Sequence, residues 1–390
     1  MANIEIEKIP AKHYPDYITN VMFQGYKWDM QAGEQGTISD NVLILTKSEA
    51  ELLAEAAVGL YNETIAMEQG IKSAPELAIE MGISNEMATA LCGCAYNAKK
   101  HIRFMRFDFH PTTDGWQISE VNSDVPAGYP EASVLPKLAA EYFPGCKQYG
   151  SFGDIFQKQI TKLIPANSTI AYLHDTHTVE DYQILHYLGD IMEGMGYHSI
   201  YGAPHHVKWA GNIAANCDAI VRYFPVEWME FDKNTQHTWQ NFVNSQTPSC
   251  NHPIALLTQS KRLPLIWDRL GLNIPMWKKY LPETKPPSNP ENGWILKPAF
   301  GRVGEGINIP GTMSNEEEQD IINAAIQHPT QWVKQQLFES KQVNGLHVNI
   351  GVFVTDGEFA GFYARVSKSP RINEDASEIP ILVKEQKYDR

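Results

Sequence analysis

The clearest alternation of polar and apolar side chains in the sequence lies between residues 102 and 122. Even positions from 104 to 108 carry Phe, Arg and Asp, and odd positions from 105 to 109 carry Met, Phe and Phe. A period of two is that of a β-strand. After the turn signal Asp114-Gly115 the alternation resumes, and one face then carries Trp116, Ile118, Glu120 and Asn122. The pattern predicts a β-hairpin.

If the two strands pair even with even positions, four polar side chains project from one face: Arg106, Asp108, Glu120 and Asn122. Two carboxylates and an amide oxygen among strands this apolar need a cation to neutralise them. Oxygen-only ligands of that kind suit Mg²⁺ better than zinc. The guanidinium beside them offers a planar fork for a carboxylate or a phosphate. A solvated hairpin face with ordinary ion pairs is the alternative.

The segment around this hairpin, residues 1–165, is otherwise predicted to be mainly helical. A short strand is expected at Val42–Leu45. Helical periodicity runs from Ser48 to about Lys100, restarts at Ser84, and returns after the hairpin from Glu131. This segment is the first of three expected regions.

Residues 166–250 form the second expected region, because strand patterns alternate there with a helical one. Strands are expected at Ser168–Leu173, Tyr197–Tyr201 and Asp218–Phe224, and a helix at Val179–Met195. This order predicts a small, Rossmann-like parallel α/β unit. No G-x-G-x-x-G follows the first strand, so we do not expect a dinucleotide site there.

Residues 251–390 form the third expected region, in which Lys297 precedes a glycine-rich loop with Gly301, Arg302, Gly304 and Gly306. Glycines let a backbone approach phosphate oxygens closely, and the cations add charge. The spacing excludes a P-loop, and a purely structural turn is the alternative to a mobile phosphate cover.

The expected elements of this third region are a helix (Ser260–Leu270), a loop (Pro282–Gly293), strands (Trp294–Pro298, Ile307–Ile309, Trp332–Leu337), a helix (Ser314–Gln327) and a final hairpin (His347–Val354 with Phe359–Val366).

The composition is that of an ordinary soluble protein, with 390 residues of which 43% are hydrophobic and 20% charged. The net charge of −14 argues against a non-specific nucleic-acid or anionic-membrane surface. The N-terminal residues lack the features of a signal peptide, and no run approaches the ~18 apolar residues of a membrane span. Five scattered cysteines favour a reducing, cytoplasmic compartment. The pairs His174/His177 and His205/His206 lack the spacing of a zinc site.

Taken together, the motifs resemble those of the ATP-grasp synthetase domain of the glutathionylspermidine synthase family. The resemblance covers residues 100 to 370 or so, and although each block is weak alone, their joint order is specific. The matching blocks are Arg106-x-Asp108 with Glu120-x-Asn122-x-Asp124, Tyr223-Phe-Pro-Val-Glu227-Trp228, Ser260-Lys261-x-x-x-Pro264-Leu-x-Trp267, Lys297-Pro-x-x-Gly301-Arg302-x-Gly304, Gln335-Gln336 and Gly361-x-x-x-Arg365.

The resemblance implies an ATP-grasp fold and a role for each matching residue. The family's metal triad falls on Asp108, Glu120 and Asn122, the set that the hairpin pattern selects. Its nucleotide-binding lysines fall on Lys261 and Lys297, and the arginines that stabilise the reacting acyl group fall on Arg106 and Arg365. Further ATP contacts are expected from Gly301, Arg302, Gly304, Gly306, Gln335 and Gln336, and substrate contacts from Asp124 and Glu227.

Three features of the sequence depart from the family pattern. The chain has no room for the amidase domain of bifunctional members. The loop after the metal asparagine reads Ser123-Asp-Val-Pro-Ala127, with apolar residues where the family places hydroxyl groups against its peptide, and Arg365 is followed by Val rather than Glu. Glutathione is therefore not implied, and the acid and the amine stay open.

The sequence predicts an α/β (α+β) protein that acts as an ATP- and Mg²⁺-dependent ligase. It would join a carboxylate, such as a peptide or amino acid, to an amine, such as a polyamine. The carboxylate would attack the γ-phosphate to give an acylphosphate, which the amine then displaces. Three alternatives stay open. One is a phosphotransferase with a stable phosphorylated product, and another is a nucleotide-binding regulatory module without turnover. The third is a hydrolase with Asp108 and Glu120 as its acid–base pair, which would leave Lys297 unexplained.

Overall fold

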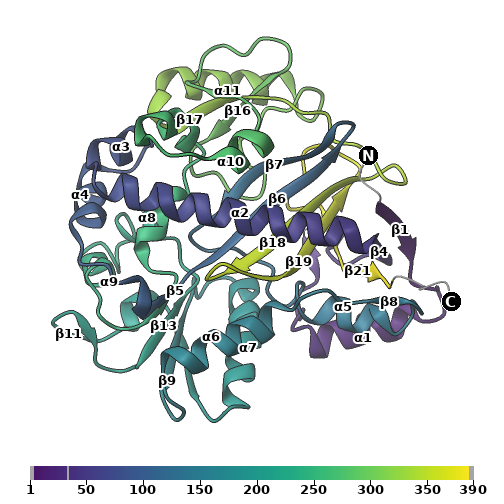
Figure 1. Cartoon of the computed structure of the whole chain (residues 1–390), viewed down its shortest axis with the longest axis horizontal. Coiled ribbons are helices and arrows are strands. Elements are labelled where there is room, and N and C mark those ends of the chain that lie inside the picture. Colours follow the sequence, from purple (N-terminus) through teal and green to yellow (C-terminus); the bar gives the residue numbers. More distant parts are fainter. Residues whose placement is uncertain (1–3, 33–34, 386–390) are drawn as a thin grey trace.

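The middle of the molecule is a five-stranded antiparallel sheet, which we call the central sheet (Figure 1). The computed structural model describes residues 4–32 and 35–385. The two predicted hairpins are confirmed, and they pair with each other through β6 and β18. In spatial order the strands are β20 (Ser377–Ile379), β19 (Glu358–Ser367), β18 (His347–Thr355), β6 (Phe104–Thr112) and β7 (Gly115–Asn122).

One face of the central sheet is apolar, because alternate side chains of β6 point toward it. Met105, Phe107 and Phe109 are fully buried in the same core cluster as the long helix α2 (Lys47–Lys72). This helix crosses that face of the sheet in Figure 1. The polar, even-numbered residues of the hairpin therefore project from the opposite face. The alternation seen in the sequence thus separates a packed face from a polar one.

The register of the β6–β7 hairpin follows the prediction up to a β-bulge. Arg106 pairs with Asn122, and Asp108 pairs with Glu120. Beyond that point the register shifts, and Ser119 becomes the extra residue of β7. A bulge redirects side chains, and in this hairpin Ser119 lines the same cavity as its neighbour Glu120.

The predicted parallel unit is present as a second five-stranded sheet, with helices α6 (Phe152–Leu163) and α7 (Val179–Glu193) packed on it. All neighbouring strands in it are parallel. The fifth strand directly precedes β6, so one stretch of backbone joins the two sheets. The order is β10 (His198–Gly202), β9 (Thr169–Leu173), β13 (Ala219–Arg222), β14 (Ser249–Cys250) and β5 (His101–Ile102).

A three-stranded antiparallel sheet stands at the top of Figure 1 and carries the helix α11 (Asn315–Gln327). The helix begins after Ser314, whose hydroxyl accepts a hydrogen bond from the Glu317 amide at 3.2 Å. The strands, in spatial order, are β15 (Thr284–Lys285), β17 (Trp332–Gln336) and β16 (Trp294–Pro298). The first of these lies inside the segment predicted to be a loop.

Two further predictions for this region are wrong. Ser260–Leu270 is not one helix but two short 3₁₀ turns, η4 (Leu263–Leu265) and η5 (Trp267–Leu270). Arg262 at their start donates hydrogen bonds to the carbonyls of Pro329 and Trp332 at 2.6 and 2.7 Å, and these tertiary contacts override the helical pattern. Residues 307–309 form no strand. The amide of Leu296 donates its hydrogen bond to the side-chain oxygen of Asn308 rather than to a backbone carbonyl of a neighbouring strand.

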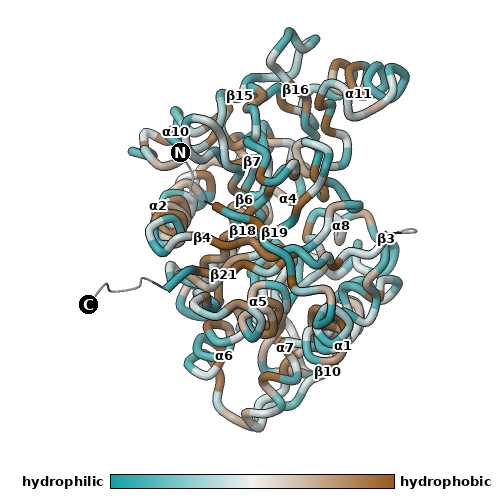
Figure 2. The backbone as a smooth tube through the Cα atoms, turned by 90° about the vertical axis from the view of Figure 1, so that its right-hand side faces the viewer, coloured by the Kyte–Doolittle hydropathy of each residue, from teal (hydrophilic) through white to brown (hydrophobic). Residues whose placement is uncertain are grey.

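A four-stranded sheet brings the two ends of the described chain together, with helices α1 (Tyr14–Gln24) and α5 (Val134–Ala140) in its core. Figure 2 shows hydrophobic stretches where β4, β21 and the central sheet meet. Helix α5 begins later than the predicted Glu131, whose carboxylate instead pairs with the buried Lys27 at 2.7 Å. The strand order is β1 (Ile4–Lys8), β4 (Asn41–Leu45), β21 (Ile381–Lys384) and β8 (Cys146–Lys147).

The predicted helical stretch before the hairpin is three α-helices. The first, α2, is capped by Thr46 rather than Ser48, and the Thr46 hydroxyl accepts from the Glu49 amide at 3.3 Å. Ser84 caps α4 (Asn85–Gly93) as predicted.

No described helix combines the length and the apolar character that crossing a membrane requires. Short elements complete the fold: α3 (Pro75–Glu80), η1 (Ala98–Lys100), β2 (Gln31–Ala32), β3 (Gln35–Gly36), η2 (Pro204–His206), β11 (Trp209–Ala210), β12 (Ile213–Ala214), α8 (Val226–Met229), α9 (Trp239–Val243), η3 (Pro253–Thr258), α10 (Pro275–Tyr280) and η6 (Pro329–Gln331).

Candidate active site

Two cavities meet on the polar face of the central sheet. The larger one has a volume of about 830 Å³ and is lined by Asp108, Lys297 and residues of the three-stranded sheet. The smaller one, about 450 Å³, is lined by Arg106 and Asn122. Glu120 and Arg365 line both cavities. The polar row of the hairpin therefore stands at a junction where the ends of two ligands can meet.

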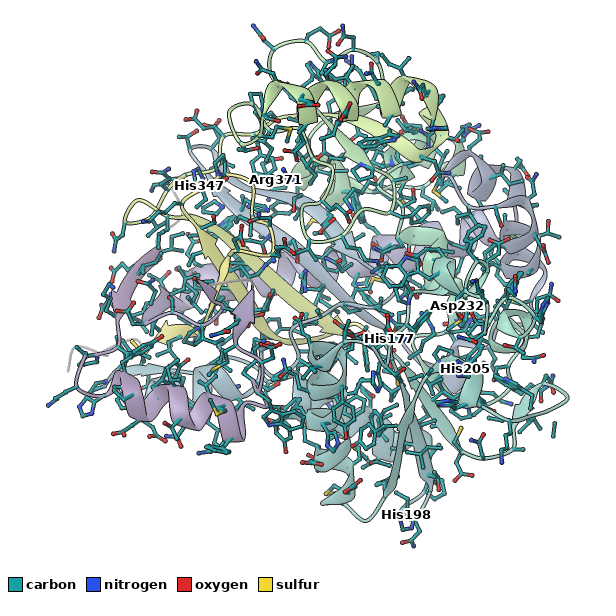
Figure 3. All side chains as sticks on the ribbon, turned by 180° about the vertical axis from the view of Figure 1, so that it is seen from behind. His177, His198, His205, Asp232, His347 and Arg371 are labelled. Atoms are coloured by element: carbon teal, nitrogen blue, oxygen red, sulfur yellow. The ribbon has the colours of Figure 1, made fainter. Side chains whose placement is uncertain are left out.

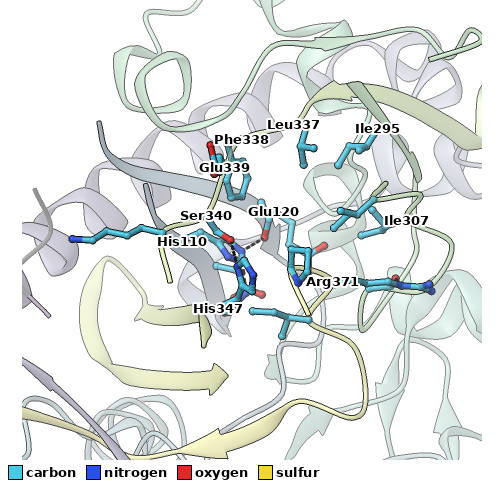
Figure 4. A pocket seen from close by; sticks show the side chains of 18 of the residues that line it. His110, Glu120, Ile295, Ile307, Leu337, Phe338, Glu339, Ser340, His347 and Arg371 are labelled. Carbon is cyan, nitrogen blue, oxygen red and sulfur yellow. Dashed lines mark hydrogen bonds between the residues drawn. The ribbon is translucent and has the colours of Figure 1, made fainter. Parts of the chain in front are cut away.

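The larger cavity has an apolar side and a polar side. Ile295, Ile307 and Leu337 gather on one side, and His110 and Glu120 lie on the other (Figure 4). Ligand pockets typically combine such an apolar wall with a few placed polar groups. The arrangement suits a ligand with a flat apolar part and a charged part.

Asp108, Glu120 and Asn122, the predicted metal ligands, come together as the strand register requires. Asn122 Nδ2 donates to Asp108 Oδ2 at 3.2 Å, which turns the amide oxygen of Asn122 away from that carboxylate. Two carboxylates and an amide oxygen are a donor set that fits a hard divalent cation such as Mg²⁺. Across residues 4–32 and 35–385, no group of three or more His, Cys, Asp or Glu side chains could hold a metal ion, so the candidate set is this mixed one.

Arg106 neutralises Asp108 in this structure. Its Nε and Nη2 donate to the two oxygens of Asp108 at 2.7 and 2.9 Å, and Nη1 donates to the Ala127 carbonyl at 2.6 Å. The guanidinium carbon lies 4.9 Å from the centre of the Tyr363 ring. A bound cation at Asp108 would compete with this pairing and leave the guanidinium available to a ligand in the smaller cavity.

Glu120 is held in its charged form by the lysines around it. Lys261 Nζ lies 2.7 Å from Glu120 Oε2 and donates to the Gly301 carbonyl at 2.6 Å. Burial alone would raise the pKa of Glu120, but attraction to Lys261, Lys297 and Arg106 outweighs burial and lowers this pKa to about 2. The carboxylate is therefore ionised at any pH at which the protein is handled.

Lys297 is buried on the wall of the larger cavity. Its ammonium donates to Gln335 Oε1 at 2.7 Å and to the Ser119 carbonyl at 3.3 Å. Burial lowers the pKa of Lys297 to about 8, with Glu120 opposing the shift and Lys261 adding to it. Gln335 is buried, whereas Gln336, the last residue of β17, is exposed. Only the first of the two predicted glutamines reaches the lysine.

If the larger cavity holds a nucleotide, as the sequence predicts, the affinity for that nucleotide should depend on pH through Lys297. Phosphate oxygens favour the charged lysine, so the pKa of Lys297 is higher in the complex than the value of about 8 in the free protein. Affinity should be full below about pH 8 and should fall by up to about tenfold per pH unit above it, until the pKa of the complex is reached. Calorimetric titration across this range checks the expectation. Lys297→Arg, which stays charged, should remove the slope, and an equal slope in that variant would contradict it.

The glycine-rich loop is a tight turn. The Glu305 amide donates to the Arg302 carbonyl at 2.9 Å, and φ is +51° at Val303 and +70° at Gly304. Positive φ at both central residues is typical of a type I′ turn. A Cβ atom on Gly304 would lie 2.8 Å from the Ile372 carbonyl oxygen. The close packing of the turn against the backbone of Ile372 is therefore a second reason for glycine at this position.

Two arginines and a lysine tie this loop to its surroundings. Arg302 pairs with Glu227 at 2.5 Å and lies over the Trp228 ring, with the guanidinium carbon 5.6 Å from its centre. Arg371 Nε donates to the Gly304 carbonyl at 3.0 Å. Lys261 holds Gly301 through the hydrogen bond to its carbonyl. The loop borders both cavities, since Gly304 lines the larger and Arg302 the smaller.

Loosening the Arg302–Glu227 pair should make the loop more mobile. Glu227→Gln removes the charge that holds Arg302, so backbone amides of residues 301–306 should exchange hydrogen faster than in the parent protein. Hydrogen exchange followed by mass spectrometry measures the change. Glu230→Gln is a matched control. Glu230 directly follows helix α8, which carries Glu227, but it accepts a hydrogen bond from Ser84 Oγ at 2.7 Å and has no described contact with the loop. Identical exchange in both variants would show that the pair does not restrain the loop.

The two predicted substrate residues have protein partners in this structure. Asp124 is fully buried, receives hydrogen bonds from both Nη atoms of Arg222, and accepts from the Val226 amide at 3.2 Å. It is absent from the described lining of either cavity. Its contacts therefore make it a support for the loop after β7. Glu227 is partly buried and occupied by Arg302, so an amine could bind it only by displacing that arginine.

Several polar residues of the larger cavity were not singled out from the sequence, and three of them contact one another: His110, Ser119 and Asn349. His110 Nε2 lies 3.0 Å from Ser119 Oγ and 3.2 Å from Asn349 Nδ2. Burial, aided by the charge of Lys297, lowers the pKa of His110 to about 3, so the ring is neutral. The alternation of β6 could have revealed His110, which follows Asp108 on the same face. The others depend on the bulge and on the pairing of β18 with β6.

The two histidine pairs that lack the spacing of a zinc site lie away from the two cavities. His177 and His205 belong to the parallel unit, apart from the cavity residue His347 in Figure 3. His177 Nδ1 contacts Asp175 Oδ1 at 2.8 Å. His347 instead contacts Ser340 Oγ through Nδ1 at 2.6 Å.

Comparison with known proteins assigns the chain to one family. Residues 8–384 match the family model described as glutathionylspermidine synthase preATP-grasp. No protein of curated function matches the sequence at a significant level. Among solved structures, a glutathione synthetase-like effector from Globodera pallida superposes with a TM-score of 0.60 at 11% identity, covering 94% of this chain and 97% of the other. That likeness shows a shared fold.

A second solved structure, described as a putative gamma-glutamylcysteine synthetase from Methylobacillus flagellatus, gives a TM-score of 0.46 at 11% identity over 79% of this chain and 88% of the other. The family model, by contrast, spans nearly the whole chain. The protein therefore belongs to the glutathionylspermidine synthase family, as its ordered motifs predicted.

Proposed function

We propose that the protein is an ATP-grasp ligase that uses ATP and Mg²⁺ to join a carboxylate to an amine. The observation that carries this proposal is the junction of the two cavities at Glu120 and Arg365. ATP would occupy the larger cavity, with its base against Ile295 and Leu337. The acid and the amine would occupy the smaller one. The γ-phosphate and the reacting carboxylate would then meet at the polar row of the hairpin.

In this proposal the buried cations hold the triphosphate. Lys297 lies on the wall of the larger cavity, and Lys261 pairs with Glu120, which lines both cavities. Phosphate oxygens would replace the side-chain and carbonyl partners that the two lysines have now. Asp108, Glu120 and Asn122 would hold a divalent cation, which would offset the negative charge of the phosphate groups.

The chemistry would proceed in two steps. A carboxylate oxygen of the acid attacks the γ-phosphorus, the bond to the β-phosphate breaks, and ADP leaves. The nitrogen of the amine then attacks the acyl carbon, phosphate leaves with the former carboxylate oxygen, and the nitrogen loses a proton. Arg365 would stabilise the oxygen on which negative charge grows in the second step, and Arg106 would hold the acylphosphate.

The smaller cavity suggests the class of substrate. Lys27, Arg106, Arg302 and Arg365 line it together with Asp29, Glu180, Glu374 and Glu378. A lining with both signs of charge suits molecules that carry both a carboxylate and an ammonium group. Amino acids, short peptides and polyamines meet this description.

Incubation with ATP, Mg²⁺ and pooled acids and amines, followed by mass spectrometry, tests the proposal. We expect ADP and a product whose mass is that of one acid plus one amine less one water. Asp108→Asn, which weakens the metal set, should form neither and serves as the control for background hydrolysis. A product that keeps the phosphate with every amine would instead establish a phosphotransferase. Binding without any turnover would indicate a regulatory module.

A further inference from the structure

Two residues that pair directly on neighbouring strands each carry a buried polar atom without a described partner. Asn349 on β18 and Arg365 on β19 are directly paired residues, and both line the larger cavity. In the described part of the chain, Asn349 Oδ1 and Arg365 Nε are shielded from solvent and lack a hydrogen-bond partner. One is an acceptor and the other a donor. Buried polar atoms are rarely left unpaired, and directly paired side chains are close enough to interact.

The orientation of the Asn349 amide is fixed by His110. Asn349 Nδ2 lies 3.2 Å from His110 Nε2, and Ser119 Oγ lies 3.0 Å from the same nitrogen. An unprotonated ring nitrogen can accept the Nδ2 hydrogen of Asn349. The free atom of the amide is therefore its oxygen.

Arg365 is held at present by a segment outside the sheet. Its Nη1 donates to the Asn373 carbonyl at 3.2 Å. Asn373 lies in the chain that follows β19, and the same stretch carries Arg371, which donates to the Gly304 carbonyl of the glycine-rich loop. The guanidinium thus has one contact with a loop and none with the sheet among the contacts described, although the sheet offers it an acceptor.

We propose that Asn349 is a positioning residue for Arg365. When the substrates bind, Arg365 Nε donates to Asn349 Oδ1, and the row formed by Ser119, His110 and Asn349 fixes the guanidinium at the junction of the cavities. Nη1 leaves the Asn373 carbonyl in this step, and both Nη groups are then free for the oxygen of the acyl group. This inference rests on the proposed ligase function, because the value of a fixed guanidinium lies in the step in which the amine attacks.

A double-mutant cycle tests whether Asn349 acts through Arg365. Asn349→Leu keeps the branched shape of the side chain and removes both polar ends. It should lower kcat for amide formation by about 10–10²-fold, the scale of a misplaced catalytic group, and leave ATP affinity within about twofold of the parent. In the Arg365→Ala background the same substitution should change kcat by less than about twofold, because the residue it positions is gone.

Thr355→Val is the matched control. Thr355 lies on the same strand, is fully buried, and its hydroxyl also has no partner among the described residues, but it is outside both cavities. This variant should keep the parent kcat. Asn349→Ala repeats the cycle if the leucine variant does not fold.

Three results would overturn the inference while leaving the ligase function intact. One is an unchanged kcat in Asn349→Leu alongside a large loss in Arg365→Ala. Another is an equal loss from Asn349→Leu in both backgrounds. The third is a loss of ATP affinity with no change in kcat. If Arg365→Ala itself costs nothing while amide formation persists, the role of Arg365 fails, and this inference fails with it.

Discussion

Arg365→Ala should lower the rate of amide formation by about 10²–10³-fold and leave the affinity for ATP within a few-fold of the parent protein. Removing one preorganised donor to a developing oxyanion usually has an effect of this size. Arg365 lines both cavities and has a buried Nε without a partner among the described atoms. Its removal should therefore disturb few contacts within the fold. Steady-state kinetics and calorimetric titration with a non-hydrolysable nucleotide measure the two quantities separately.

Lys297→Ala provides the contrast to that variant. Its partner in the proposed reaction is a phosphate in the ground state, so nucleotide affinity should weaken first. Arg365→Ala with full amide-forming turnover would show that the role assigned to this arginine is wrong. Equal losses of ATP affinity in both variants would show that the nucleotide and the acyl group do not bind in separate cavities.

Asp124→Asn should destabilise the fold by about 3–5 kcal/mol, because it leaves the buried charge of Arg222 without its partner. The side chains of this pair are 0% and 1% exposed. Urea denaturation gives the free energy of unfolding. Asp40→Asn is a matched control, since Asp40 pairs at 2.8 Å with Lys8, which is 67% exposed. That exposed pair should contribute about 1 kcal/mol or less. Similar small losses in both variants, together with weaker substrate binding in Asp124→Asn, would return Asp124 to the substrate role predicted from the sequence.

The hairpin shows how far local patterns predict this structure. Alternation and the Asp-Gly turn signal located both strands, and the even-with-even register brought Asp108 opposite Glu120. The parallel unit could be predicted for the same reason, because strands and helices there alternate with clear periods. Lys297 and the glycine turn were also marked by their local sequence.

Other features depend on contacts between distant parts of the chain. Arg222 neutralises Asp124 from 98 residues away, and no local pattern reveals that Asp124 will be buried. Asn349 reaches the cavity because β18 pairs with β6. Ser119 faces the cavity because of a bulge, which alternation cannot predict. The side chain of Arg262 draws residues 260–270 out of a regular helix through tertiary hydrogen bonds.

Isotope transfer from the acid to phosphate tests the central proposal most directly. An acid accepted in the substrate screen, with its carboxylate labelled by heavy oxygen, is converted with ATP, Mg²⁺ and the amine. Its carboxylate oxygen attacks the γ-phosphate, so we expect inorganic phosphate that carries one heavy oxygen, in an amount equal to the amide formed. Unlabelled phosphate, with amide formed all the same, would contradict an acylphosphate intermediate and with it the proposed roles of Arg106 and Arg365.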